Sequence, residues 1–301
     1  MMSISAAAAL DAYEAARHRL PPLQATPDQV EQVASLADLA DRFDVFLLDA
    51  FGVLNVGETV IPSAPASVAH LQGLGKKVMV VSNAASVGTQ ELLAKYTALG
   101  FRFALEDIVT SRQALTSSMN GSRDRLWGVV APAGASLGDL GLPHTVALED
   151  DPEAYAACDC ILLIGTGDWT DARQALLEAA VRQTSKPVYV ANPDIVAPRE
   201  TGFSVEPGHI AHRLADIADV TPQFYGKPFS NIFDLAFERL GPVDRNRVVM
   251  VGDSLHTDVL GARSYGIAAA LIPDFGFFSS GDADKAIART GIVPDFLVAQ
   301  P

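Results

Sequence analysis

Residues 43–54 read Phe-Asp-Val-Phe-Leu-Leu-Asp-Ala-Phe-Gly-Val-Leu, and this stretch decides the fold of the chain. Its apolar run is typical of a buried strand, ends in one acid, Asp49, and is followed by a glycine at Gly52. In an open α/β sheet, small ligands bind in the crevice beyond the carboxyl ends of the strands. We therefore expect an α/β fold with Asp49 at the mouth of a functional site.

The sequence beyond this stretch alternates predicted strands and helices, which indicates a parallel sheet with helices on both faces. Before the alternation begins, residues 3–40 are predicted to be helical in two pieces, with Thr26 capping the second piece and Pro27 at its first position. The predicted strands cover 43–48, 77–81, 126–130, 160–164, 187–190, 247–251 and 267–272, and the predicted helices cover 64–74, 89–99, 172–182, 210–217, 232–240 and 257–264.

The length of 301 residues is long for one ordinary domain and comfortable for two. The middle of the chain contains its own series of alternating strands and helices, which favours a second α/β unit inserted into the first. The predicted organisation is a helical N-terminal extension over 1–40, a core domain over 41–115 and 208–301, and an α/β cap domain over 116–207.

Composition restricts the partners of the protein. The net charge of -14 argues against nucleic acid or an anionic membrane as the main partner. No uninterrupted apolar run reaches the length of a membrane span, and the first ten residues lack the basic segment of an export signal. Cys158 and Cys160 lie too close for a framework disulfide, so we expect two reduced thiols and a cytoplasmic location.

Polar side chains stand where four predicted strands end, and parallel strands bring such ends to one edge of the sheet. A carboxylate there can attack phosphorus, and a hydroxyl and a lysine can hold phosphoryl oxygens. Further carboxylates suit Mg²⁺, which prefers oxygen ligands. The residues in question are Asp49, Ser82 with Asn83, Lys227, and Asp253 with Asp258.

These segments resemble the four ordered motifs of the haloacid dehalogenase (HAD) superfamily. The motifs are carried by residues 49–54, Ser82-Asn83, Gly226-Lys227-Pro228 and residues 251–258. Asn192-Pro193-Asp194 and the inserted unit are similar to subclass IIA, the branch of NagD and 4-nitrophenylphosphatase. The resemblance implies a Rossmann-like core, a separate α/β cap, Mg²⁺, and hydrolysis through an aspartyl-phosphate on Asp49.

The resemblance also implies roles for individual residues. The residues implied to be catalytic are Asp49, Ser82 and Lys227, and those implied to bind substrate are Ser82, Asn83, Asn192, Asp194 and Lys227. The implied metal ligands are Asp49, the backbone carbonyl of Phe51 and Asp253. Asp258 and Ser254 are implied to support the metal ligands from behind. Simpler interpretations stay open: Ser82 can cap a helix, Asn192 and Asp194 can shape a turn, and Asp258 suits the first turn of a helix. His256 is expected on a helix surface.

Phe51 departs from the pattern of the phosphatases in this family, in which a second Asp at this position protonates the leaving group and later activates water. Phenylalanine transfers no proton, and general acid–base catalysis contributes about 10²–10⁴-fold. Three interpretations follow: a slow phosphatase, including one that borrows a proton donor from the cap, other chemistry of the superfamily such as dehalogenation, or a pseudoenzyme that binds a phosphometabolite.

The retained acids Asp253 and Asp258 argue against a dehalogenase, which needs no metal. A phosphonatase needs a lysine in the cap, and the only lysine between residues 116 and 207 is Lys186, next to a proline in a predicted turn, which argues against that chemistry as well. We therefore predict a Mg²⁺-dependent phosphatase of low activity that acts on a small phosphorylated metabolite, with the pseudoenzyme as the alternative. Related caps often pair, so a homodimer through the cap is expected. Three cap arginines stay unassigned, namely Arg173, Arg182 and Arg199.

Overall fold

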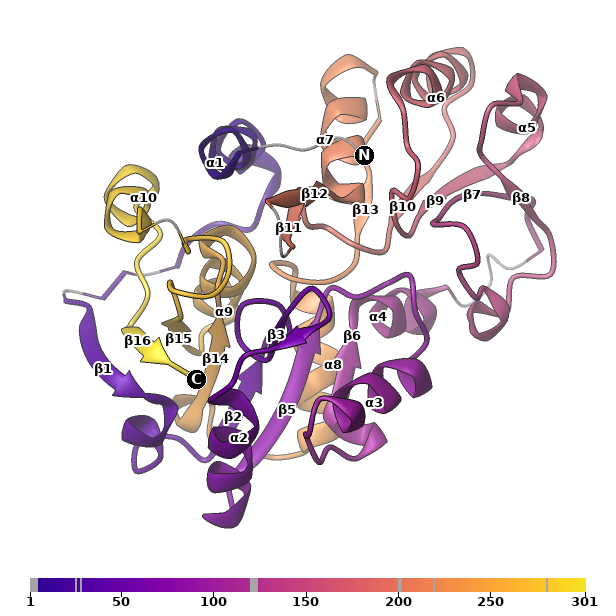
Figure 1. Ribbon diagram of the computed structural model, residues 1–301. Coiled ribbons are helices and arrows are strands. Elements are labelled where there is room, and N and C mark those ends of the chain that lie inside the picture. Colours follow the sequence, from indigo (N-terminus) through magenta and orange to yellow (C-terminus); the bar gives the residue numbers. More distant parts are fainter. Residues whose placement is uncertain are drawn as a thin grey trace.

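The computed structural model describes residues 5–24, 26–27, 29–119, 124–199, 202–218, 220–279 and 281–301. Two parallel sheets organise them (Figure 1). The seven-stranded sheet has the order β1-β16-β15-β14-β2-β5-β6, with β1 at Glu31–Ser35, β2 at Val45–Leu48, β5 at Lys77–Ser82, β6 at Ile108–Thr110, β14 at Val248–Gly252, β15 at Ala268–Leu271 and β16 at Phe296–Gln300.

Strand β2 lies inside this sheet, and all four of its residues are buried. Val45 and Leu47 pack into the hydrophobic cluster on one face, and Phe46 and Leu48 pack into the cluster on the other. The first face is covered by α1 (Ala6–Ala15), α8 (Ser230–Leu240), α9 (Leu260–Tyr265) and α10 (Ala283–Thr290), and the second by α2 (Ala64–Gly73) and α3 (Thr89–Ala98). Burial on both faces explains why the strand reads as a continuous apolar run.

The five-stranded sheet has the order β13-β10-β9-β7-β8. Helices cover one of its faces, and on the other face Trp127 and Leu162 pack with Ala85 and Leu115 of the first unit. We call this sheet and its three helices the cap, residues 124–225. Its elements are β7 (Trp127–Val130), β8 (Thr145–Ala147), α5 (Pro152–Ala157), β9 (Cys160–Leu163), α6 (Asp171–Gln183), β10 (Val188–Val190), α7 (Pro207–Ile217) and β13 (Gln223–Phe224).

Two antiparallel hairpins lie outside the large sheets. The first pairs β3 (Asn55–Val56) with β4 (Thr59–Val60) just after Asp49, and the second pairs β11 (Val196–Pro198) with β12 (Phe203–Val205). In Figure 1 the second hairpin lies where the cap meets the core, beside α1. The remaining helix, α4 (Ser111–Ser118), packs against α8 and β6 in the core.

The predicted α/β class and parallel-sheet core are confirmed. None of the helices in the described part of the chain combines the length and the apolar character needed to cross a bilayer. Both cysteines are buried and unpaired, as expected for reduced thiols.

The prediction of a separate helical extension over 1–40 is wrong in its second half. Residues 31–35 form β1, which pairs in parallel with β16 at the edge of the core sheet, and residues 36–39 form a short 3₁₀ turn. Thr26 and Pro27 lie outside any helix, while residues 3, 4, 25 and 28 of the predicted segment are outside the described residues. A five-residue edge strand with mostly exposed side chains carries little apolar alternation, so its pairing partner, rather than local propensity, sets its structure.

The predicted cap boundaries also need correction. Strand β13 pairs with β10, and Ile210, Ala211 and Leu214 of α7 belong to the hydrophobic cluster of the cap, so the cap continues past residue 207. At the other end, the boundary at residue 116 cuts through α4, which is a core helix. Elements that are neighbours in the sequence can belong to different domains even where no loop marks the boundary, because strand pairing decides which domain an element joins.

Candidate active site

Three of the predicted strand ends lie side by side because β14, β2 and β5 are neighbours in the core sheet. Asp253 follows β14, Asp49 follows β2, and Ser82 closes β5. Lys227 reaches the same edge from the connection between β13 and α8. These four residues therefore meet at the carboxyl edge of the sheet, as the alternation pattern predicts.

Lys227 lies at the centre of the site, and its side chain is 1% exposed. Its Nζ lies 2.6 Å from Asp49 Oδ1 and 2.7 Å from Asp258 Oδ1. Burial alone would lower the pKa of Lys227, but the charges of Asp258 and Asp49 outweigh it and raise that pKa above its usual value. The lysine is therefore a fixed positive charge.

Asp49, Asp253 and Asp258 form a compact acidic group in which one ligand atom from each lies within 4.8 Å of the others. Burial raises the pKa of Asp49 to about 6, with Lys227 opposing the shift. Burial, followed by the charges of Asp258 and Asp49, raises the pKa of Asp253 well above its usual value. The crowding of like charges in this group is the condition that a bound cation relieves.

The surrounding backbone keeps space for these acids. A Cβ on Gly52 would meet Asp253 Cβ at 2.4 Å, and a Cβ on Gly276 would meet Asp253 Oδ2 at 1.8 Å. The backbone N–H of Phe277 donates to Asp253 Oδ2 over 2.7 Å, and that of Ser254 donates to Asp258 Oδ2 over 3.1 Å. Buried oxygen donors held in this way are chemically suited to Mg²⁺.

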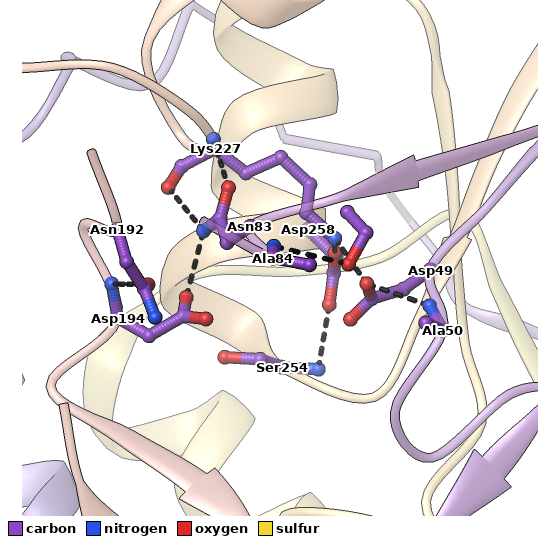
Figure 2. Close-up of polar contacts among 10 residues, drawn as sticks. Asp49, Ala50, Asn83, Ala84, Asn192, Asp194, Lys227, Ser254 and Asp258 are labelled. Carbon is purple, nitrogen blue, oxygen red and sulfur yellow. Dashed lines mark hydrogen bonds and ion pairs between the residues drawn. The ribbon is translucent and has the colours of Figure 1, made fainter. Parts of the chain in front are cut away.

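Asn83 connects the loops of the site rather than facing Asp49 directly. Its Oδ1 accepts the backbone N–H of Lys227 at 2.8 Å, and its Nδ2 donates to the Lys227 carbonyl at 3.0 Å and to Asp194 Oδ1 at 2.7 Å (Figure 2). Ser82 is buried, and its Oγ accepts the backbone N–H of Ala84 at 3.3 Å, so its own hydroxyl proton stays available to a ligand.

Asn192 and Asp194 come from the segment between β10 and β11. Asn192 Oδ1 accepts the backbone N–H of Asp194 at 2.9 Å, which is the turn that the simpler interpretation expected, and Asn192 Nδ2 donates to Glu206 Oε2 at 3.2 Å. Burial raises the pKa of Asp194 to about 8, with Asp49 and Glu206 adding to the shift and Lys227 and Asn83 opposing it. Asp194 is therefore mostly protonated at neutral pH.

A cavity of about 300 Å³ opens above these residues, between the core and the cap. It is lined by every predicted site residue apart from Lys227 and Asp258, which lie beneath it. Residues that the sequence did not assign to the site also line it, namely Tyr13, Glu58, Lys95, Arg199, Glu206 and Phe277. Of the unassigned cap arginines, Arg199 lies in the cavity wall, whereas Arg173 pairs with Asp150 and Arg182 donates to the carbonyl of Ile217.

Phe51 lies in the cavity wall beside two cations. The guanidinium carbon of Arg199 is 5.3 Å from the centre of the Phe51 ring, and Lys95 Nζ is 5.7 Å from it. Arg199 comes from the β11–β12 hairpin and also pairs with Glu206 at 3.0 Å. Nothing in the local sequence around Arg199 connects it to Phe51, because 147 positions of chain, including the cap strands β7 to β10, separate the two.

His256 is buried, contrary to the expectation of a surface residue. Its Nε2 lies 2.7 Å from Glu14 Oε1, and its ring stacks on Tyr13 with 4.8 Å between centroids. Both partners belong to α1, which the sequence left without a role. The helix that covers His256 lies 242 residues earlier in the chain, so spacing alone could not reveal the contact.

Comparison with known proteins agrees with this geometry. A model of haloacid dehalogenase-like hydrolases matches residues 46–136, and a second, HAD-hydrolase-like model matches residues 224–299. The two matches contain the strand ends described above, and the residues between them, 137–223, belong to the cap. The chain belongs to the haloacid dehalogenase superfamily.

Relatives of this HAD protein include curated phosphatases. Glycerol-3-phosphate phosphatase of Homo sapiens is 27% identical over 292 residues, which cover 88% of this chain and 89% of the relative. The 4-nitrophenylphosphatase of Schizosaccharomyces pombe is 23% identical over 87% of this chain and 93% of its own length, which supports the predicted subclass IIA. A crystal structure described as a possible sugar phosphatase of the HAD superfamily from Cytophaga hutchinsonii is 25% identical, with a TM-score of 0.78 over 90% of this chain and 98% of that one.

Proposed function

We propose that this HAD protein is a Mg²⁺-dependent phosphatase that hydrolyses a small phosphate monoester through an aspartyl-phosphate on Asp49. The observation that carries the proposal is the placement of Asp49 on the floor of a cavity, against a charged lysine and beside two further acids. The names of the phosphatase relatives support the same reaction class.

Asp49 is held in a position suited to attack. Its Oδ1 accepts the backbone N–H of Ala50 at 2.7 Å and contacts Lys227 Nζ at 2.6 Å. Among the described residues both contacts fall on Oδ1, so Oδ2 is the oxygen available to phosphorus. Attack forms the bond from Asp49 to phosphorus and breaks the ester bond, and the leaving alcohol takes up a proton. Water then attacks the phosphorus, releases phosphate and restores the Asp49 carboxylate.

Lys227 and Ser82 supply positive charge and a hydrogen bond to the transferred group. The Lys227 ammonium has three N–H groups, and its contacts with Asp49 and Asp258 leave one for a phosphoryl oxygen. The Ser82 hydroxyl donates to a second phosphoryl oxygen. Because both groups are fixed before substrate arrives, they stabilise the charge of the transition state without reorganisation.

Asp49, Asp253 and the backbone carbonyl of Phe51 would hold the Mg²⁺, with Asp258 and Ser254 behind them. A bound Mg²⁺ supplies positive charge that offsets the repulsion between anionic Asp49 and an anionic phosphate, which is about 4 kcal/mol at 4 Å for an effective dielectric of 20. The three clustered carboxylates of this chain fit such an ion, since burial and then the charges of Asp258 and Asp49 raise the pKa of Asp253.

The substrate that we propose is a small phosphorylated metabolite, in keeping with a cavity of about 300 Å³ and with relatives named for glycerol 3-phosphate. Phe51 replaces the acid of other phosphatases in the family, so we expect slower turnover of esters with poor leaving groups.

A panel of phosphate esters with and without Mg²⁺ tests the proposal. We expect phosphate release that requires Mg²⁺ and falls at least about 10³-fold in Asp49→Asn, because the amide is a poor nucleophile. The matched control is Asp41→Asn, which changes an exposed acid before β2 and should retain wild-type activity. A parallel panel of haloacids without metal covers dehalogenation.

The outcomes separate the candidate functions. Mg²⁺-dependent release that survives in Asp41→Asn and not in Asp49→Asn supports the phosphatase. Binding of inorganic phosphate with no turnover of any ester favours the pseudoenzyme, the alternative to which the phenylalanine at position 51 points. Metal-free haloacid turnover would overturn the proposed reaction class.

A further inference from the structure

Phosphatase chemistry at Asp49 requires a proton for the leaving alcohol, and Phe51 has none to give. Other groups in the cavity wall or beneath it bear protons. Lys227 keeps its proton, because the pKa of this lysine is raised by Asp258 and Asp49 against the effect of burial. Tyr13 is also a poor donor, since burial and then the charge of Asp194 raise its pKa well above the usual value. Two buried carboxyl groups, Asp194 and Glu206, line the same cavity. Both oxygens of Glu206 accept hydrogen bonds, from Ser204 and Arg199 on Oε1 and from Asn192 on Oε2, which favours Asp194 as the donor.

Hydrogen bonds connect Asp194 to the loops that carry the proposed phosphate-binding residues. Its Oδ1 accepts the Nδ2–H of Asn83 over 2.7 Å, and Asn83 in turn makes hydrogen bonds with both the N–H and the carbonyl of Lys227. Figure 2 shows Asp194 on the cap side of the pair formed by Asn83 and Lys227, with Asp49 on the opposite side. Asp49, Ser82 and Asp194 line the same cavity, so a phosphate ester held there by Ser82 and Lys227 would have both acids as neighbours.

The groups around Asp194 keep its carboxyl neutral near pH 7. Tyr13 of α1 faces it, as do Asp49 after β2, Glu206 before α7 and Lys227 before α8. Burial is the largest effect on the pKa of Asp194, and Asp49 and Glu206 add to it, so that this pKa reaches about 8 in spite of Lys227 and Asn83. The hydrogen bond from Asn83 uses Oδ1, which leaves Oδ2 to carry the proton.

We propose that Asp194 is the general acid of this enzyme and protonates the leaving alcohol in place of the acid that Phe51 replaces. This proposal rests on the proposed phosphatase function. As Asp49 attacks and the ester bond breaks, the leaving oxygen takes the proton from Asp194, which becomes a carboxylate. That carboxylate then accepts a proton from the water that attacks the aspartyl-phosphate, so both acids return to their starting states.

Asp194→Asn removes the proton and keeps the size of the side chain. On an alkyl phosphate, whose leaving group needs protonation, we expect kcat to fall by about 10²–10⁴-fold. On 4-nitrophenyl phosphate, whose anion leaves readily, the loss should be less than about ten-fold. The decline of wild-type kcat on alkyl phosphates as the pH rises through about 8 should be absent in the variant.

Glu206→Gln is the matched control, because Glu206 is another buried carboxyl in the cavity wall and is held by Ser204 and Arg199. Because Glu206 adds to the pKa of Asp194, we expect Glu206→Gln to keep the decline of kcat on alkyl phosphates with rising pH and to move it to a lower pH, whereas Asp194→Asn should remove it. A second test adds Phe51→Asp to Asp194→Asn, which should recover part of the lost alkyl phosphatase activity by supplying another acid.

Equal losses on both esters in Asp194→Asn, with no change in the pH profile, would show that the residue only positions the loops and would overturn the proposal. Unchanged activity on the alkyl ester would overturn it as well. Wild-type protein that hydrolyses neither ester removes the proposed function itself, which is a different result from an active wild type that tolerates the variant. Thermal unfolding and binding of inorganic phosphate by each variant check that the site remains folded.

Discussion

Phe51 changes which chemical groups line the site without changing the backbone arrangement around it. Its backbone still lies beside the acidic cluster, while its ring contacts the Arg199 guanidinium and the Lys95 ammonium. Contacts of this kind contribute about 0.5–1 kcal/mol each at exposed sites. The ring therefore links the core to the β11–β12 hairpin at the position where the family resemblance predicts a proton donor.

Replacing Phe51 by Asp should restore a proton donor and raise kcat on alkyl phosphates by about ten-fold, with little gain on 4-nitrophenyl phosphate. Arg199 and Lys95 would favour the ionised form of the new carboxyl, so the gain should be larger below neutral pH than above it. The measurement is kcat against pH for both esters.

Phe51→Leu serves as its control, because it removes the ring contacts without adding an acid. If the leucine variant gains as much as the aspartate variant, the ring rather than the missing proton limits turnover. A folded Phe51→Asp protein that binds Mg²⁺ and gains on no ester would mean that the site differs from other phosphatases in more than this residue.

At the scale of elements, α1 and the 3₁₀ turn Arg17–Arg19 after it bridge the core and the cap. Toward the core, Asp11 pairs with Arg289 at 2.5 Å and Glu14 with His256 at 2.7 Å. Toward the cap, Arg19 pairs with Asp216 of α7 at 2.5 Å. The N-terminal helix therefore holds together the two units whose junction forms the cavity.

Tyr13 provides the most buried contact of this bridge, a hydrogen bond in which its Oη accepts the backbone N–H of Ile195 at 3.0 Å. Tyr13→Phe leaves that buried N–H without its partner, so the free energy of unfolding should fall by about 1–3 kcal/mol. Tyr225→Phe is the control, since within the described part of the chain its hydroxyl makes only a long, exposed contact with Gln223. Urea unfolding measures both, and equal losses would contradict a special role for Tyr13.

At the scale of the whole molecule, the acidic cluster couples stability to pH and to metal. The pKa of Asp253 is raised in the folded protein by burial and by Asp258 and Asp49, above the value of about 3.9 for an unfolded Asp. The contribution of Asp253 to the stability of the metal-free fold is therefore most favourable below that unfolded value and is lost as the pH rises toward the folded pKa of Asp253. A bound cation offsets this loss.

Mg²⁺ at a hundred times its Kd should therefore raise the melting temperature of the wild type at pH 8 by roughly 5 °C. Asp253→Asn should remove most of that rise and, without metal, should melt at or above the wild-type temperature, because the repulsion is gone. Asp168→Asn changes an exposed acid and should respond to Mg²⁺ like the wild type. A full Mg²⁺ response in Asp253→Asn would exclude this residue as a ligand.

Much of the fold could be predicted because the signals were local. The apolar run of β2 has all four residues buried, and its acid marks the carboxyl edge. Parallel pairing then brings the ends of β14, β2 and β5 together whatever their separation in the chain. The sequence by itself thus determined the α/β class, the inner strands β2, β5, β14 and β15 of the core sheet, and the meeting of Asp49, Ser82 and Asp253.

Other features were decided only by the tertiary structure, because they depend on neighbours that local patterns do not specify. Strand β1 takes its conformation from β16 across the sheet, and α7 with β13 belongs to the cap through pairing with β10. Arg199 reaches Phe51 only through the β11–β12 hairpin. The protonation of Asp194 follows from burial beside Asp49 and Glu206, and burial is a property of the folded molecule alone.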